Sequence, residues 1–204
     1  GGLHRSPYRG VSVEFAQHRE YVPGDDIRFL DWKVFGRSDR YYVKEFEVET
    51  YLTCHFFLDA SESMKFSSGE VSKFNYGTSI AAAFAYLTLH QGDASSLVFF
   101  DERVAQTIPP GRGGGHLKLL LDTLQGMKPS KKTSAGPSLH ALAERLHRKG
   151  IVVILSDLLD ESEGILSGLE HLKHNGHEIL VFHLLDRAEH DFPYDRMTLF
   201  EGME

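Results

Sequence analysis

The stretch that decides the fold is Leu52-Thr53-Cys54-His55-Phe56-Phe57-Leu58, followed at once by Asp59-Ala60-Ser61-Glu62-Ser63. The first seven residues are mostly apolar and rich in aromatic groups, which is typical of a buried strand. Because this strand stops at Asp59, one carboxylate and two hydroxyls are expected at the carboxyl end of the sheet, where open α/β sheets bind their ligands. Oxygen donors of this kind suit a hard divalent cation such as Mg²⁺.

Apolar strands alternate with helical segments through the rest of the chain. The expected strands cover 95–100, 104–108, 151–155 and 178–185, and the expected helices cover 75–90, 116–124, 138–148 and 163–174. This alternation predicts an α/β fold with a doubly wound, mostly parallel sheet. Residues 41–58 indicate one long bent strand. The stretch 196–204 looks like the start of another strand, so we expect the domain to be truncated at its C-terminal end.

Residues 1–40 differ from the rest and predict an ordered N-terminal arm, which leaves 41–204 as the main domain. The arm mixes charges of both signs with aromatic residues, and it carries too many large apolar groups for a disordered tail. Its candidate partner-binding residues are Arg19, Asp25, Asp26 and Arg28. An internal ion-pair network is the commoner use of such charges, and the two roles are compatible.

The overall composition excludes some classes of partner. Apolar residues make up 41% of the 204 residues, enough for a full core, and the net charge is −7 without a long basic run. This charge disfavours nucleic acid and anionic membrane surfaces as main partners. The single cysteine, Cys54, lies in a predicted strand, so a disulfide framework is impossible. No stretch reaches the ~18 apolar residues that span a bilayer, so we expect no membrane span in this segment.

Two further positions complete a candidate metal site with Asp59, Ser61 and Ser63. Asp157 closes the predicted strand 151–155 by way of Ser156, and Thr133 lies in the loop before the helix 138–148. In a doubly wound sheet these loops share one edge, so the groups can converge. Two carboxylates and three neutral hydroxyls would bind Mg²⁺ or Mn²⁺ with modest affinity. The ion would stay electrophilic enough to accept a carboxylate from outside.

The same five residues resemble the metal-ion-dependent adhesion site of von Willebrand A-type domains. The N-terminal residues extend the match, because Arg19-Glu20-Tyr21, Pro23-Gly24-Asp25-Asp26 and Asp31-Trp32 resemble the domain of unknown function 58 family, from about Gly10 to the end of the chain. The closing stretch Thr198–Gly202 is also similar to that family. The resemblance implies a von Willebrand A-like, Rossmann-type fold in a bacterial or archaeal protein of the cytoplasm. It also implies a gene commonly found beside that of a MoxR-type AAA+ ATPase.

One departure from the family pattern concerns the third segment of the site. Many related sites have Gly before the Thr, whereas Lys131-Lys132 precede Thr133 here. It is therefore open whether Thr133 or Ser134 faces the metal. By itself, Asp-x-Ser-x-Ser is often only a helix N-cap or a turn.

Two classes of function follow from these residues. The first is a non-enzymatic interaction module whose metal site engages an acidic side chain of a protein partner, by family resemblance the MoxR-type AAA+ ATPase or its client. The second is a metal-assisted hydrolase of phosphate esters that uses Asp59 as nucleophile or metal ligand. Against the hydrolase, no Lys or His is clearly placed near Asp59 in the sequence, although Lys65 and Lys73 are available. A third interpretation is a vestigial site in a structural spacer.

Overall fold

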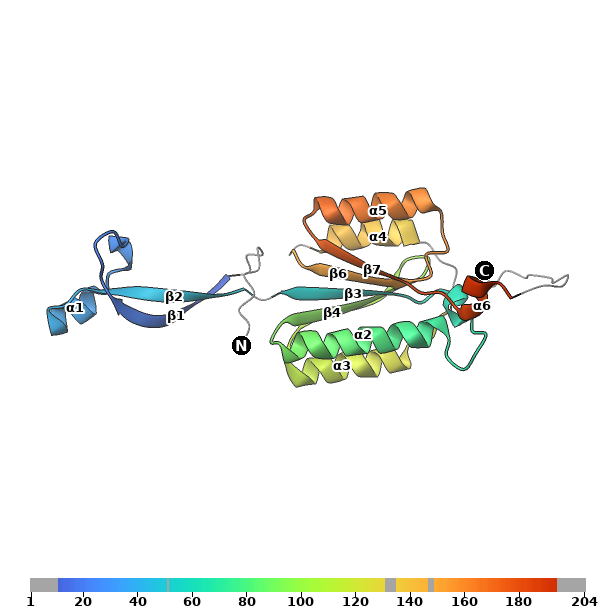
Figure 1. Cartoon of the computed structure of the whole chain (residues 1–204), viewed down its shortest axis with the longest axis horizontal. Coiled ribbons are helices and arrows are strands. Elements are labelled where there is room, and N and C mark those ends of the chain that lie inside the picture. Colours follow the sequence, from blue (N-terminus) through green and yellow to red (C-terminus); the bar gives the residue numbers. More distant parts are fainter. Residues whose placement is uncertain (1–10, 51, 131–134, 147–148, 194–204) are drawn as a thin grey trace. The chain divides into compact units, whose positions relative to one another are not determined.

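The computed structural model describes residues 11–50, 52–130, 135–146 and 149–193 (Figure 1). The chain divides into two compact units, Gly1–Tyr51 and Leu52–Glu204. The division lies later in the chain than the 40/41 boundary that the sequence suggested. The reason is that the expected single strand over 41–58 is two strands, β2 (Tyr42–Thr50) and β3 (Thr53–Asp59), which belong to different sheets.

The first unit is a two-stranded antiparallel hairpin of β1 (Val11–Glu20) and β2. Its connection carries the 3-10 helix η1 (Ile27–Phe29) and the helix α1 (Trp32–Ser38). Asp31 caps α1, because its carboxylate accepts hydrogen bonds from the backbone N–H groups of Lys33 and Val34. The same carboxylate lies 2.9 Å from Nε2 of His18, so one buried acid ties the connection to β1.

The second unit is built on a five-stranded sheet in the order β5-β4-β3-β6-β7. The strands are β3, β4 (Ala94–Phe100), β5 (Val104–Gly111), β6 (Ile151–Ser156) and β7 (Glu178–His183). Four of them run parallel, and β5 pairs antiparallel with β4. The sequence therefore predicted a mostly parallel sheet correctly, including the short edge strand that turns back after β4.

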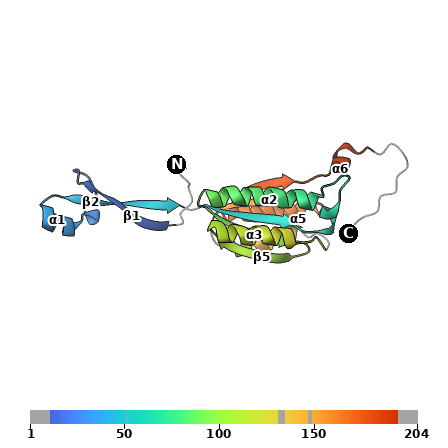
Figure 2. The same ribbon diagram turned by 90° about the horizontal axis from the view of Figure 1, so that it is seen from below.

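Helices cover both faces of this sheet (Figures 1 and 2). They are α2 (Lys73–His90), α3 (Gly113–Gly126), α4 (Ala135–Arg145), α5 (Ser162–His174) and the short α6 (Arg187–Asp191), with a 3-10 turn η2 (Glu62–Lys65) after β3. Alternate residues of β3 point to opposite faces. Phe56 and Leu58 join the core under α2 and α3, while Phe57 joins the core under α4 and α5. Because both faces are covered, β3 is largely buried, and its last residue, Asp59, places a carboxylate at the carboxyl edge of the sheet.

Candidate metal centre

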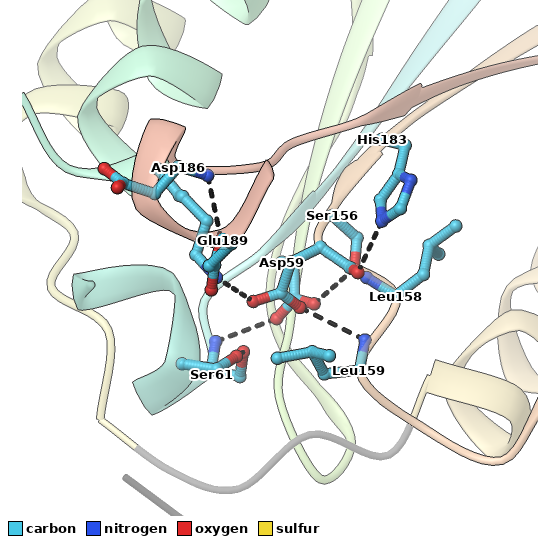
Figure 3. A network of polar contacts seen from close by, with 11 residues as sticks. Asp59, Ser61, Ser156, Leu158, Leu159, His183, Asp186 and Glu189 are labelled. Atoms are coloured by element: carbon cyan, nitrogen blue, oxygen red, sulfur yellow. Dashed lines mark hydrogen bonds and ion pairs between the residues drawn. The ribbon is translucent and has the colours of Figure 1, made fainter. Parts of the chain in front are cut away.

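The carboxylate of Asp59 lies at the end of β3 and is fully buried. Its Oδ1 accepts a hydrogen bond of 2.9 Å from the backbone N–H of Ser61, which turns the chain back toward the carboxylate. The hydroxyls of Ser61 and Ser63 lie 3.0 Å apart, and both serines are buried. One carboxylate and two hydroxyls therefore gather within one turn after the strand, as the motif predicted (Figure 3).

Ser156 connects this turn to the neighbouring strand. It is the last residue of β6, and its hydroxyl donates a hydrogen bond of 2.5 Å to Oδ2 of Asp59. The hydroxyl oxygen also accepts from the backbone N–H of Leu158 at 2.9 Å. Leu158 has a φ of 54°, a left-handed conformation that is costly for a branched side chain. The backbone after β6 is thus bent to hold Ser156 against Asp59.

Asp157 follows Ser156 and is buried, but its carboxylate already has a cationic partner. Nζ of Lys73, the first residue of α2, donates to Oδ2 of Asp157 at 2.8 Å. The same Nζ donates to Oε1 of Glu189 in α6 at 2.6 Å. Only 2% of the Lys73 side chain is exposed. One buried ammonium therefore bridges two carboxylates, one from the loop after β6 and one from α6.

Burial and charge shift the pKa values of this cluster. Desolvation is the main reason that the pKa of Asp59 is raised to about 6, and the nearby charge of Asp157 adds to it, while hydrogen bonds from Ser156 and Ser61 work against it. Burial by itself would lower the pKa of Lys73, but the two carboxylates outweigh this and raise it. Lys73 is therefore a fixed cation near neutral pH. The ionised form of Asp59 is only partly stabilised by its surroundings.

The donor set fits a hard divalent cation. Asp59 offers a carboxylate without a cationic partner among the described residues, and two hydroxyl oxygens lie beside it. No cluster of three or more His, Cys, Asp or Glu side chains that could hold a metal exists among the described residues, so a softer, nitrogen- or sulfur-based site is not seen there. A metal bound by Asp59, Ser61, Ser63 and Asp157 would supply an electrophilic centre for an incoming carboxylate.

Four of the five predicted ligands thus lie in one polar network, and the fifth lies outside the described residues. Asp59, Ser61, Ser63 and Asp157 meet at the carboxyl edge of the sheet. Thr133 falls within 131–134, which lies outside the described residues. The closing stretch Thr198–Gly202 also lies outside them, within 194–204. The described neighbour Ala135 donates its backbone N–H to Asp160 at 2.7 Å, which brings the start of α4 to the loop after β6.

The sequence missed three members of the network: Ser156, Lys73 and Glu189. In the sequence, Lys73 is only a possible acid or base for the hydrolase, and nothing there places it near the predicted ligands. The signal that could have found it is Ser72, whose side chain caps α2 by accepting from the N–H of Asn75. This cap makes Lys73 the first helical residue. A positive charge at the N-terminus of a helix is unfavourable, so a lysine there needs nearby carboxylates to offset the cost.

The candidate partner-binding residues of the first unit are paired with one another. Arg19 forms ion pairs with Asp25 at 2.8 Å and Glu45 at 2.7 Å, and Arg28 forms one with Asp26 at 2.6 Å. Hydrogen bonds from Arg19 and the N–H of Val22 hold the pKa of Asp25 below its usual value. The internal ion-pair network is therefore present, and a role in partner binding stays a prediction.

Comparison with known sequences identifies relatives along most of the chain. The family described as "Protein of unknown function DUF58" matches residues 17–204. An uncharacterized protein of Mycobacterium tuberculosis is 26% identical over 197 residues, which cover 94% of this chain and 61% of that protein. The chain thus spans about three fifths of the length of the curated relatives that it matches.

Solved structures show the same fold at low sequence identity. An aerotolerance-related membrane protein from Bacteroides fragilis matches with a TM-score of 0.53 and 15% identity, over 64% of this chain and 66% of that chain. A pilus adhesin, SpaC from Lactobacillus rhamnosus GG, matches with a TM-score of 0.50 and 12% identity, over 66% of this chain and 25% of that one. Such identities show a shared fold alone. Within the described residues, no helix has the length and apolar character to cross a membrane.

Proposed function

The chain belongs to the DUF58 family of proteins of unknown function, and we propose that its second unit is a von Willebrand A-like interaction module that binds Mg²⁺ or Mn²⁺. Asp59, Ser61, Ser63 and Asp157 hold the ion, together with Thr133 by resemblance. The bound ion then accepts an acidic side chain of a protein partner. The partner proposed from the family resemblance is a MoxR-type AAA+ ATPase or one of its clients.

The observation that carries the proposal is the convergence of Asp59 with Ser61, Ser63 and Asp157 at one edge of the sheet. Lys73 neutralises one of the two carboxylates before any metal arrives. Apart from these two carboxylates, the proposed ligands are neutral hydroxyls, so an ion in this site would stay electrophilic. A weakly neutralised ion attracts a further carboxylate, which is what an adhesion-type site needs.

Water relaxation on bound Mn²⁺ tests this function directly. Mn²⁺ held by the protein relaxes its coordinated water, so a carboxylate that displaces the water lowers the relaxation rate. We expect a Glu-containing peptide to lower the rate with the parent protein, and the matching Gln-containing peptide to leave it unchanged. Equal effects of the two peptides, or the same response to the Glu-containing peptide in Asp59→Asn as in the parent, would remove the acidic-ligand function.

The metal-assisted hydrolase is the alternative function, and the same variant separates it from the first. Lys73 lies near Asp59, but its ammonium is held between two carboxylates and does not serve as a proton acceptor in that state. Turnover of a generic phosphate ester with Mg²⁺ or Mn²⁺ that disappears in Asp59→Asn would establish the enzyme. We expect no Asp59-dependent turnover.

A further inference from the structure

The bridge from Asp157 through Lys73 to Glu189 links the metal centre to α6, and it carries an inference about how the site is regulated. Nζ of Lys73 lies 2.8 Å from Asp157 at the sheet edge and 2.6 Å from Glu189 in α6. The Asp157 side chain is fully buried and that of Glu189 is 28% exposed. A buried ammonium is tolerated only when anions compensate it, so Lys73 depends on both carboxylates.

The short helix α6 depends in turn on a few polar contacts. All five of its residues are described, and it buries Ala188 alone. Glu189 closes a capping box, because its Oε2 accepts the N–H of Asp186 at 2.8 Å while its Oε1 accepts from Lys73. Asp186 also accepts the N–H of Ser68 at 3.0 Å. Figure 3 shows the hydrogen bond between Asp186 and Glu189. A change at Lys73 therefore reaches the cap of α6 directly.

The space around this bridge allows movement. A pocket of about 360 Å³ lies between the start of α2 and the segment that leads into α6, and Lys73 forms part of its wall. Its other lining residues are Val71, Ser72, Tyr76, Leu184, Leu185, Asp186 and Arg187. The pocket therefore leaves open space beside Lys73, and Ala188 is the buried residue of α6, so a shift of α6 would disturb little packed core.

A divalent ion at Asp59 competes with Lys73 for the same carboxylate. The ion and the ammonium repel each other, and both are attracted to Asp157. At separations of a few ångströms in the protein, such a repulsion exceeds the free energy of a tenfold change in affinity. Asp157 therefore cannot bind the metal and the buried ammonium as strongly together as it binds either one alone.

We propose that Lys73 is the built-in counter-cation of the metal-free site, and that metal binding draws Asp157 away from Lys73 and thereby loosens α6. This inference rests on the proposed function, because it requires that the site binds metal. If it is correct, α6 is firmly held when the site is empty and loosely held when metal is bound. Lys73 is a positioning residue here and touches neither the ion nor a partner.

The experiment combines metal titration with hydrogen exchange on the whole chain. We expect Lys73→Met to bind Mn²⁺ at least tenfold more tightly than the parent, because the competing cation is gone. We expect the amides of α6 to exchange faster in the parent when Mg²⁺ is added. In Lys73→Met they should already exchange fast in EDTA and change little with Mg²⁺. Lys118→Met, which removes an exposed lysine paired with Asp122, is the matched control and should behave as the parent.

The outcomes separate this inference from the function on which it rests. Metal binding of equal or lower affinity in Lys73→Met would overturn the inference while leaving the metal site intact, as would α6 exchange in the parent that does not respond to metal. Absence of binding in both proteins would remove the proposed function and the inference with it. If Lys73→Met does not fold, Glu189→Gln keeps the inference testable, because α6 should then exchange faster than in the parent in EDTA and should change little when Mg²⁺ is added.

Discussion

The hydroxyl of Ser156 donates a 2.5 Å hydrogen bond to the carboxylate of Asp59 across two neighbouring strands. The two residues are 97 positions apart in the sequence and lie at the ends of β6 and β3. Through the same hydroxyl, the backbone N–H of Leu158 in the loop after β6 is joined to Asp59. The hydroxyl also gives the buried carboxylate a hydrogen-bond donor in place of water.

Replacing Ser156 by Ala should destabilise the protein and disturb the site. The variant leaves Asp59 without its side-chain donor and the N–H of Leu158 without its acceptor, so we expect a loss of roughly 1–3 kcal/mol in the free energy of unfolding. Chemical denaturation measures this loss. Ser95→Ala is the matched control, because Ser95 is equally buried and its hydroxyl has no hydrogen-bond partner among the described residues. A similar loss in both variants would show that cavity formation, and not the bond to Asp59, is responsible.

Replacing Asp59 by Asn should stabilise the metal-free protein at high pH. The pKa of Asp59 is raised to about 6, so the folded state binds a proton more tightly than the unfolded state, and ionised Asp59 opposes folding above that pH. We expect Asp59→Asn to gain roughly 1–3 kcal/mol at pH 8 in EDTA, and to lose this advantage below pH 4. Thermal unfolding at the two pH values measures the difference. A variant less stable than the parent at pH 8 would contradict the unfavourable burial of this charge.

Two buried histidines should make the protein sensitive to acid. His55 is 3% exposed, and desolvation, with His177 adding to it, lowers its pKa to about 4. Desolvation also lowers the pKa of His177. The unfolded histidines bind protons near pH 6.5, whereas the folded protein keeps them neutral to lower pH. The free energy of unfolding is therefore highest above pH 6.5 and falls as the pH drops toward 4, by up to about 3 kcal/mol for His55.

The test of this acid sensitivity is the pH dependence of unfolding in His55→Gln. We expect its free energy of unfolding to change less between pH 7 and pH 4.5 than that of the parent. His174→Gln, at an exposed position on α5, is the control and should keep the parental dependence. An unaltered slope in His55→Gln would place the acid sensitivity elsewhere.

The close contact of α4 with α5 requires glycine at position 136 in α4 but not at position 164 in α5. A Cβ at Gly136 would lie 2.8 Å from the backbone carbon of Gly164, whereas a Cβ at Gly164 would meet its nearest atom at 3.7 Å. We expect Gly136→Ala to destabilise the protein by about 1–3 kcal/mol, and Gly164→Ala to be neutral or slightly stabilising. Denaturant unfolding of the two variants compares them. Equal effects would mean that the helices are not packed this closely.

The sheet and the carboxyl-edge carboxylates could be predicted from the sequence because their signal is local. The apolar run before Asp59 and the run 151–155 each stop at a polar residue, and a strand covered on both faces must do so at the sheet edge. The hairpin could not be predicted this way. Residues 41–58 form an almost unbroken strand pattern, and only pairing with β1 shows that Tyr42–Thr50 belong to another sheet.

The buried bridge could not be predicted, because a lysine carries no local sign of burial. Lysine is almost always exposed unless it is paired, and its partners here lie 84 and 116 residues away. The sequence shows Asp157 as a free ligand, whereas in the fold it already neutralises Lys73. Ser156 was missed for the same reason, since its role depends on the register between β6 and β3.

Anomalous X-ray diffraction from crystals of the chain saturated with Mn²⁺ tests the central claim most directly. We expect one strong peak at the carboxyl edge of the sheet, within coordination distance of an oxygen of Asp59 and of the hydroxyls of Ser61 and Ser63. The same peak should be absent from crystals of Asp59→Asn. A map without a peak at this edge at saturating Mn²⁺, or with Mn²⁺ bound only at sites remote from Asp59, would contradict that claim.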